Sequence, residues 1–208
     1  EEELGGPLVD RIGKRNELTP LGHAVLERAR RIVFEAEELK LGAEALQHGG
    51  MGTLRVLVNG GDLVATAQVR SATGAMRLQA SGAVDLQADV MSTSGHVTVV
   101  SGGALTLGAG VDVETTSTAY LKSGLALTMA GDAKVTGSSV NVLGHGDVTL
   151  GQVVVTGQVG VTSETGRVTS AALAATAQNV VAAGLRLNAV EGLGLATALA
   201  TTPLKTTV

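Results

Sequence analysis

The sequence predicts a mainly β protein: a parallel β-solenoid of about seven coils, preceded by one long α-helix. From residue 60 onward the chain repeats about every 20 residues, and each unit opens at a glycine with a polar neighbour. Within the units, apolar residues alternate with small or polar ones, as at Leu105 and Leu107 or Val148 and Leu150. Such alternation between glycine-rich turns is typical of short, half-buried strands. Because no unit can bury its apolar row alone, the units are expected to stack and share one core.

The composition agrees with a narrow core. Of the 208 residues, 44% are hydrophobic, but there is a single Phe, a single Tyr and no Trp. A narrow solenoid is filled by Val, Leu, Ala and Thr, whereas a compact globular core usually contains aromatic residues. The absence of cysteine excludes a disulfide framework and a thiolate metal site. The net charge of −4 gives no reason to expect a nucleic acid or an anionic membrane as a partner, and no apolar run of about 18 residues predicts a membrane span.

Charge density divides the chain into two predicted domains, residues 1–57 and 58–208. The first 52 positions hold 17 charged residues, and the remaining 156 hold the same number. This threefold change in density marks a boundary. In the solenoid domain we expect Leu86, Leu107, Leu127 and Leu150 to stack in one inward row. The stretch Ser170–Ala183 is rich in alanine and compatible with a helical turn, so we expect the least regular coil there.

The first domain is predicted to contain one continuous helix over about residues 20–47. Thr19 is expected to be its N-cap and Pro20 its first residue, while Gly49 and Gly50 stop it. Large and small apolar residues recur at heptad spacing and form a candidate helix-pairing face: Val25, Ala29, Ile32, Ala36, Leu39, Ala43 and Leu46. This face predicts self-association through residues 20–47 or a cap on the open end of the solenoid. The alternative is an amphipathic helix that lies on its own domain.

The N-terminal segment also resembles part of a known family. It is similar to the second half of a LysR-type transcriptional regulator DNA-binding domain plus its linker helix. The matching elements are Glu3-Leu4-Gly5, Pro7-Leu8, Arg11, Lys14-Arg15, Leu18-Thr19-Pro20 with Gly22, Leu26-Glu27-Arg28-Ala29-Arg30 and Gly52-Thr53-Leu54-Arg55-Val56. The resemblance implies the end of a recognition helix, a β-hairpin wing and a long helix that pairs antiparallel in a dimer. It also implies that Arg11, Lys14 and Arg15 contact DNA phosphates.

Two departures from that family limit what the resemblance implies. Val9 stands where the family commonly has Phe, and the helices that read bases in the major groove have no counterpart in this sequence. Phosphate contacts position a protein on DNA without specifying sequence. We therefore expect DNA binding to be weak and non-specific at most.

Residues 60–208 resemble the repeats of filamentous-haemagglutinin-like proteins, which are large bacterial adhesins exported by two-partner secretion. The likeness lies in the repeat length and in the Gly, Val, Thr, Ala and Leu content. It implies a right-handed parallel β-helix and a ligand on a host surface or cell surface. An extracellular or cell-surface location would follow from this interpretation, and a cytoplasmic one from the regulator interpretation.

The sequence offers no catalytic, metal or cofactor site. No partner stands at ligand spacing from any of the four histidines, which we expect on the surface or in turns: His23, His48, His96 and His145. Asp62, Asp132 and Asp147 follow glycine but lack the dense calcium-binding repeat. We expect them to bond their own turn backbone. The charges of the repeats are scattered rather than gathered on one face, so the chain is not expected to be an enzyme.

Two hypotheses for the function remain, and they come from different classes. The first is a non-enzymatic structural or adhesive β-solenoid of a bacterial surface or secreted protein. The second is a truncated or chimeric LysR-type DNA-binding regulator. The abrupt change near residues 56–60 also leaves open that two unrelated coding pieces have been joined.

Overall fold

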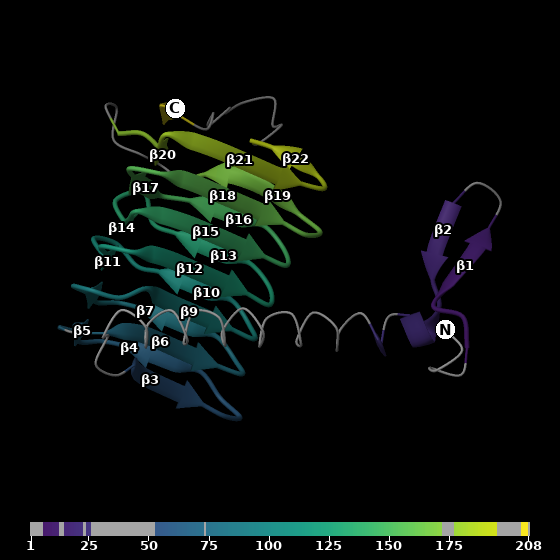
Figure 1. Ribbon diagram of the computed structural model, residues 1–208, viewed down its shortest axis with the longest axis horizontal. Helices are drawn as coiled ribbons and strands as arrows, with labels where there is room; N and C mark the ends of the chain where they lie inside the picture. The colour runs from purple at the N-terminus through teal and green to yellow at the C-terminus, as the bar shows by residue number, and fades with distance from the viewer. Residues whose placement is uncertain are drawn as a thin grey trace. The chain divides into compact units, whose positions relative to one another are not determined.

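The computed structural model is mainly β and describes residues 6–12, 15–22, 24–25, 53–72, 74–171, 177–194 and 205–207. The chain divides into two compact units, Glu1–Gly49 and Gly50–Val208. The second unit is a parallel β-solenoid (Figure 1), as the sequence predicts. Each coil contributes one strand to each of three sheets, which we call sheets 1, 2 and 3 in the order in which the chain visits them.

All neighbouring strands of the three sheets are parallel, and each sheet has seven strands. Sheet 1 consists of β3 (Thr53–Val58), β6 (Ala75–Ala80), β9 (Val97–Ser101), β12 (Thr118–Ser123), β15 (Ser139–Gly144), β18 (Gln158–Ser163) and β21 (Gly184–Ala189). Sheet 2 consists of β4 (Leu63–Ala65), β7 (Val84–Leu86), β10 (Leu105–Leu107), β13 (Leu127–Met129), β16 (Val148–Leu150), β19 (Arg167–Ser170) and β22 (Gly192–Leu193). Sheet 3 consists of β5 (Val69–Ser71), β8 (Val90–Ser92), β11 (Asp112–Thr115), β14 (Lys134–Gly137), β17 (Gln152–Val155), β20 (Val180–Val181) and β23 (Thr206–Thr207). The chain therefore makes about six turns from the first strand of a sheet to its last.

The solenoid begins earlier than the repeat pattern indicates. Residues 53–57, which the sequence pattern assigns to the N-terminal domain, lie in β3. Leu54 and Val56 are register partners of Met76 and Leu78 in β6. The boundary between the two units, after Gly49, lies eight residues before the expected one after residue 57. Thr53–Val58 thus supplies the first strand of sheet 1.

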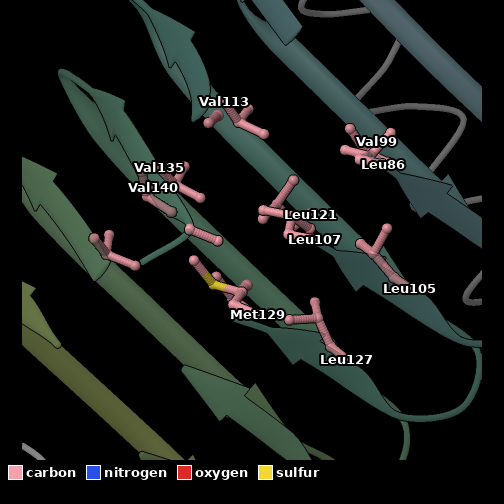
Figure 2. Close-up of a cluster of buried hydrophobic side chains, with 14 of the residues drawn as sticks. Leu86, Val99, Leu105, Leu107, Val113, Leu121, Leu127, Met129, Val135 and Val140 are labelled. Atoms are coloured by element: carbon pink, nitrogen blue, oxygen red, sulfur yellow. The ribbon is translucent and has the colours of Figure 1, made fainter. Parts of the chain in front are cut away.

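The core consists of the inward-facing rows of all three sheets. Because side chains alternate across a strand, every second residue points inward and stacks on its equivalents in the coils before and after it. Leu105, Leu107, Val148 and Leu150 are fully buried, as their alternation predicts. Figure 2 shows such side chains from several strands gathered in one interior, among them Leu107 from β10 beside Leu121 from β12.

One predicted row is wrong by two residues. Leu86 and Leu107 are register partners, but the next residue in that row is Met129 and not Leu127. Leu127 instead continues the parallel row that contains Leu105 and Val148. The coil between Leu105 and Leu127 is one residue longer than the coil before it, which runs from Val84 to Leu105. The predicted leucines are 21, 20 and 23 residues apart, so the predicted row crosses at Leu127 into the neighbouring row.

The connection from sheet 2 to sheet 3 becomes long in the last coils. Gly151 alone separates β16 from β17, whereas residues 171–179 separate β19 from β20. Asn179 ends this connection and is fully buried. Its Nδ2 donates to the carbonyl oxygens of Leu150 (2.7 Å) and Gly151 (2.9 Å), and its Oδ1 accepts from the backbone N–H of Lys205 (3.0 Å). The predicted irregular coil lies here, and residues 172–176 are outside the described residues.

The N-terminal unit contains a two-stranded antiparallel hairpin, β1 (Val9–Ile12) and β2 (Arg15–Leu18). The backbone N–H of Gly22 donates to Thr19 Oγ1 at 2.8 Å, which is the N-cap geometry, and residues 20–22 and 24–25 are helical. The predicted helix start is confirmed. The rest of the predicted helix, residues 26–47, lies outside the described residues, so the structure gives the long helix no support and it stays a prediction.

Candidate functional site

The outer face of sheet 1 is the broadest regular surface of the solenoid. Most strands of sheet 1 have six residues, whereas most strands of sheet 2 have three. Alternation therefore places up to three outward residues per coil on sheet 1 and one per coil on sheet 2. The middle outward row of sheet 1 contains, in register, Arg55, Arg77, Thr98, Tyr120, Asn141, Gly160 and Arg186. Three of its seven residues are arginines, and Arg77 and Thr98 are buried, so the row is polar but does not repeat one side chain along the solenoid.

The outward row of sheet 2 is more uniform. It contains a run of four threonines in register: Thr106, Thr128, Thr149 and Thr169. The hydroxyl oxygens of Thr149 and Thr169 lie 3.2 Å apart, which is hydrogen-bond distance. At the strand spacing of about 4.8 Å, the four side chains form a single column of hydroxyl and methyl groups along the solenoid.

Buried serines stabilise the turn between sheets 1 and 2. Ser101 Oγ lies 2.8 Å from the carbonyl oxygens of both Gly82 and Ala104, and Ser123 Oγ lies 2.9 Å and 2.7 Å from those of Gly103 and Ala126. Ser163 repeats the contact with the Gly146 carbonyl oxygen at 2.7 Å. We call Ser101, Ser123 and Ser163 the serine ladder. Each hydroxyl contacts the turn of the preceding coil and so adds a side-chain hydrogen bond to the backbone bonds that already join these turns.

Sequence reasoning did not find the serine ladder, although its signal is present. Ser101 and Ser123 each stand directly before a glycine that opens a repeat, 22 residues apart. The Ser-Gly pair indicates a turn, but the sequence of a single repeat does not reveal the contact of the serine with the preceding coil.

Two of the three predicted turn aspartates bond the backbone of the next coil and not their own, which corrects the prediction for Asp62 and Asp147. Asp62 Oδ1 accepts from the N–H of Ala83 at 2.6 Å, and Asp147 Oδ1 accepts from the N–H of Arg167 at 2.9 Å. The sequence separations are 21 and 20 residues. Asp132, the third predicted turn aspartate, is exposed. The carboxylates of Asp62 and Asp147 therefore connect successive turns.

Among the described residues, ion pairs and a histidine–carboxylate hydrogen bond join neighbouring coils. His145 Nδ1 lies 3.0 Å from Glu164 Oε2, Arg167 Nη2 lies 3.2 Å from Glu191 Oε2, and Lys134 Nζ lies 3.7 Å from Asp112 Oδ2. All three pairs are partly exposed, and such pairs contribute about 0.2–1 kcal/mol each. The partner of His145 could not be found at ligand spacing because it belongs to the next coil. His23 and His48 lie outside the described residues, and His96 is half-buried.

Two of the three residues predicted to bind DNA, Arg11 and Arg15, lie on the hairpin. Arg11 is in β1 opposite Asn16, and Arg15 is in β2 opposite Ile12. Lys14 lies outside the described residues, as do the side chains of Arg11 and Arg15. Of the predicted pairing face, Val25 is helical and half-buried. The other members lie outside the described residues: Ala29, Ile32, Ala36, Leu39, Ala43 and Leu46.

Within the described part of the chain, no three His, Cys, Asp or Glu side chains gather in a group that could hold a metal ion. Nor do the described residues include a helix with the length and hydropathy needed to cross a membrane. No protein-family model, curated protein or solved structure matches the chain.

Proposed function

We propose that this chain is a non-enzymatic structural and adhesive β-solenoid of a bacterial surface or secreted protein. The observation that carries the proposal is the continuous three-sheet stack, in which coil follows coil in register for about six turns. A solenoid of this kind presents long, regular faces, and extended surfaces are what repeat proteins use for binding. A right-handed coil and export by two-partner secretion, as the resemblance to filamentous-haemagglutinin-like repeats implies, belong to the same proposal.

The ligand-binding surface of this proposal is the outer face of sheet 1 from β12 to β21. This face offers an aromatic ring at Tyr120, an amide at Asn141 and a guanidinium at Arg186, all in one register row. Asn141 and Arg186 are exposed, and Tyr120 is half-buried. An aromatic ring next to amide and cationic donors suits contact with polar surface molecules, because the ring supplies apolar area and the donors supply orientation.

An attachment assay tests the adhesive part of the proposal. Beads coated with the full chain are expected to attach to cell surfaces under flow, and the double variant Asn141→Glu/Arg186→Glu is expected to lose most of that attachment. Thr128→Glu, at an exposed position on the outer face of sheet 2, is the matched control and should attach like the wild type. Equal attachment by a core variant that no longer folds, Leu121→Asp, would contradict an adhesive role of the solenoid.

A second candidate function, a truncated or chimeric LysR-type regulator, is favoured by the N-terminal unit. A hairpin followed directly by a Thr19-capped helix start is the order of elements that the LysR resemblance implies for the wing and linker helix. A mobility-shift assay of the full chain at ~150 mM salt separates the candidates, because phosphate contacts weaken steeply with salt. We expect weak DNA binding at most, and we expect competitor DNAs of different sequence to displace the chain equally well. Sub-micromolar binding that survives competitor DNA and is lost in Arg11→Ala/Lys14→Ala/Arg15→Ala would make the regulator the first candidate.

A further inference from the structure

The two ends of the described solenoid expose the strands that lie outermost in each sheet. At one end these strands are β3, β4 and β5, and at the other they are β21, β22 and β23. Every strand between them pairs on both sides with the equivalent strands of neighbouring coils. The two ends therefore offer the same kind of surface as the coil-to-coil interface that the chain forms within itself.

The first coil leaves part of its core rows in contact with solvent. Leu54 and Val56 in β3 are 39% and 37% exposed, whereas their equivalents two coils later, Val97 and Val99, are fully buried. Leu57, on the outer side of β3, is 52% exposed. Interior strands bury these rows by stacking the next coil on them, so the end of the solenoid lacks the burial that one more coil would supply.

At the other end of the described solenoid, the core rows are also incompletely buried. Leu193 in β22 is 56% exposed, and its register partner Val168 in β19 is fully buried. Leu185 and Leu187 in β21 are half-buried, whereas Val159 and Val161, their partners in β18, are buried. The rows of Leu54 and Val56 are thus partly exposed at both ends, whereas the row that runs from Leu63 to Leu193 is buried at Leu63 and exposed at Leu193.

β3 carries little of the protection that edge strands usually have. Natural edge strands are shortened, bulged, or marked with lysine or proline. The β3 sequence Thr-Leu-Arg-Val-Leu-Val is six residues long, has no proline and has a single charge at Arg55. Short apolar strands of this composition are prone to pair with further strands.

We infer that a second copy of this chain docks on the β3 end through its β21 end, so that copies stack head to tail. In register, Leu185 and Leu187 of one copy would continue the rows of Leu54 and Val56 of the next, and Leu193 would continue the row of Leu63. The contact is heterologous and leaves a free end on each copy, so the product is an open filament. This surface is distinct from the predicted helix-pairing face in residues 20–47.

The charges of the two end strands do not oppose this docking. It places Arg186 of one copy next to Arg55 of the neighbouring copy, two like charges at strand spacing. The solenoid already contains this arrangement, because Arg55 and Arg77 are register partners inside one chain. The inward rows that meet are uncharged.

The mass of the full chain measured against its concentration tests the docking. The wild type is expected to give particles whose mass grows with concentration without stopping at a dimer. Val56→Lys places a charge on the exposed end row and should reduce the mass to that of a monomer. Val154→Lys is the matched control, because Val154 is 38% exposed but lies on β17, which pairs on both sides; its assembly should equal the wild type. A monomeric wild type, or a Val56→Lys variant that assembles like the wild type, would overturn the inference.

Engineered cysteines decide the orientation even if Val56→Lys fails to fold. The chain has no cysteine, so Arg55→Cys and Arg186→Cys each introduce a single thiol. Neighbouring strands bring register partners to about 4.8 Å, within the Cα separation that disulfides span. A mixture of the two variants is expected to form disulfide-linked dimers on oxidation, and neither variant alone should do so. No cross-link in the mixture, or equal cross-linking of Arg55→Cys alone, would overturn the head-to-tail arrangement.

Discussion

Single residues stabilise this solenoid in two ways. Inward aliphatic side chains are removed from water, at about 25 cal/mol for each Å² of apolar surface. Leu121 in β12 is an example, with Val99 and Val142 as its register partners in the adjacent coils. Buried hydroxyls, such as that of Ser123, add a side-chain contact to turn carbonyl groups that also accept a backbone N–H, as Gly103 does from Leu125 and Ala126 from Leu105.

Replacing Leu121 by Ala should lower the free energy of unfolding by about 2–5 kcal/mol, because it leaves a cavity between two stacked coils. Chemical denaturation monitored by circular dichroism measures the change. Leu125→Ala, at an exposed leucine of the adjoining turn, is the control and should change the free energy by less than about 0.5 kcal/mol. Equal effects of the two substitutions would contradict the inward assignment of Leu121.

Replacing Ser123 by Ala should cost about 0.5–1.5 kcal/mol, since the carbonyl oxygens of Gly103 and Ala126 lose the contact with its hydroxyl but keep their backbone N–H donors. The same denaturation experiment applies. Ser138, a half-buried serine of the connection between β14 and β15, provides a matched Ser→Ala control with a smaller expected loss. A Ser123→Ala variant as stable as the wild type would show that the serine ladder does not stabilise the fold.

At the scale of elements, the turns determine which residues stack. Short strands could be predicted from alternation alone, as at Leu105 and Leu107, because the inward phase is visible within one repeat. The register between coils could not, because it depends on turn lengths that vary from coil to coil. That variation is why Met129 and not Leu127 continues the row of Leu107. The turn aspartates show the same limit, since Asp62 and Asp147 bond residues of the next coil.

Close stacking of the turns makes Gly124 sensitive to substitution. A Cβ atom at Gly124 would lie 2.1 Å from the carbonyl oxygen of Gly102 in the coil below. Gly124→Ala is therefore expected to destabilise the fold by about 1–3 kcal/mol through overpacking. Gly146→Ala, in the next coil at the same corner, meets its nearest atom at 3.5 Å and should be tolerated. Melting temperatures of both variants test this, and a tolerated Gly124→Ala would show that the turns are farther apart than described.

Asn179 is expected to hold the end of the chain against the solenoid. Its amide joins Leu150, Gly151 and Lys205, which are distant in sequence. Asn179→Ala should leave these groups without its contacts and loosen Lys205–Thr207. Limited trypsin digestion is expected to cleave after Lys205 faster in this variant than in Asn188→Ala, an exposed control in β21. Identical cleavage rates would show that Asn179 does not secure this segment.

At the scale of the whole molecule, the solenoid class followed from the repeat and from the scarcity of aromatic residues, because both are visible in the sequence. The start of the solenoid at Thr53 could not be predicted, since the residues Gly52–Val56 also fit the LysR-like pattern. The candidate adhesive surface could not be predicted either. The outward row of Tyr120, Asn141 and Arg186 exists only once the register of the coils is known.

The central claim, a parallel solenoid with the stated register, is tested most directly by disulfide mapping on the outer face of sheet 2. Thr106 and Thr128 are register partners one coil apart, and Thr149 is the next partner of Thr128. Oxidation of Thr106→Cys/Thr128→Cys is expected to give an intramolecular disulfide, because parallel neighbours lie about 4.8 Å apart. Thr106→Cys/Thr149→Cys, separated by two strand spacings of about 4.8 Å, should remain reduced. A folded monomer in which the first pair stays reduced, or in which both pairs cross-link equally, would contradict the solenoid.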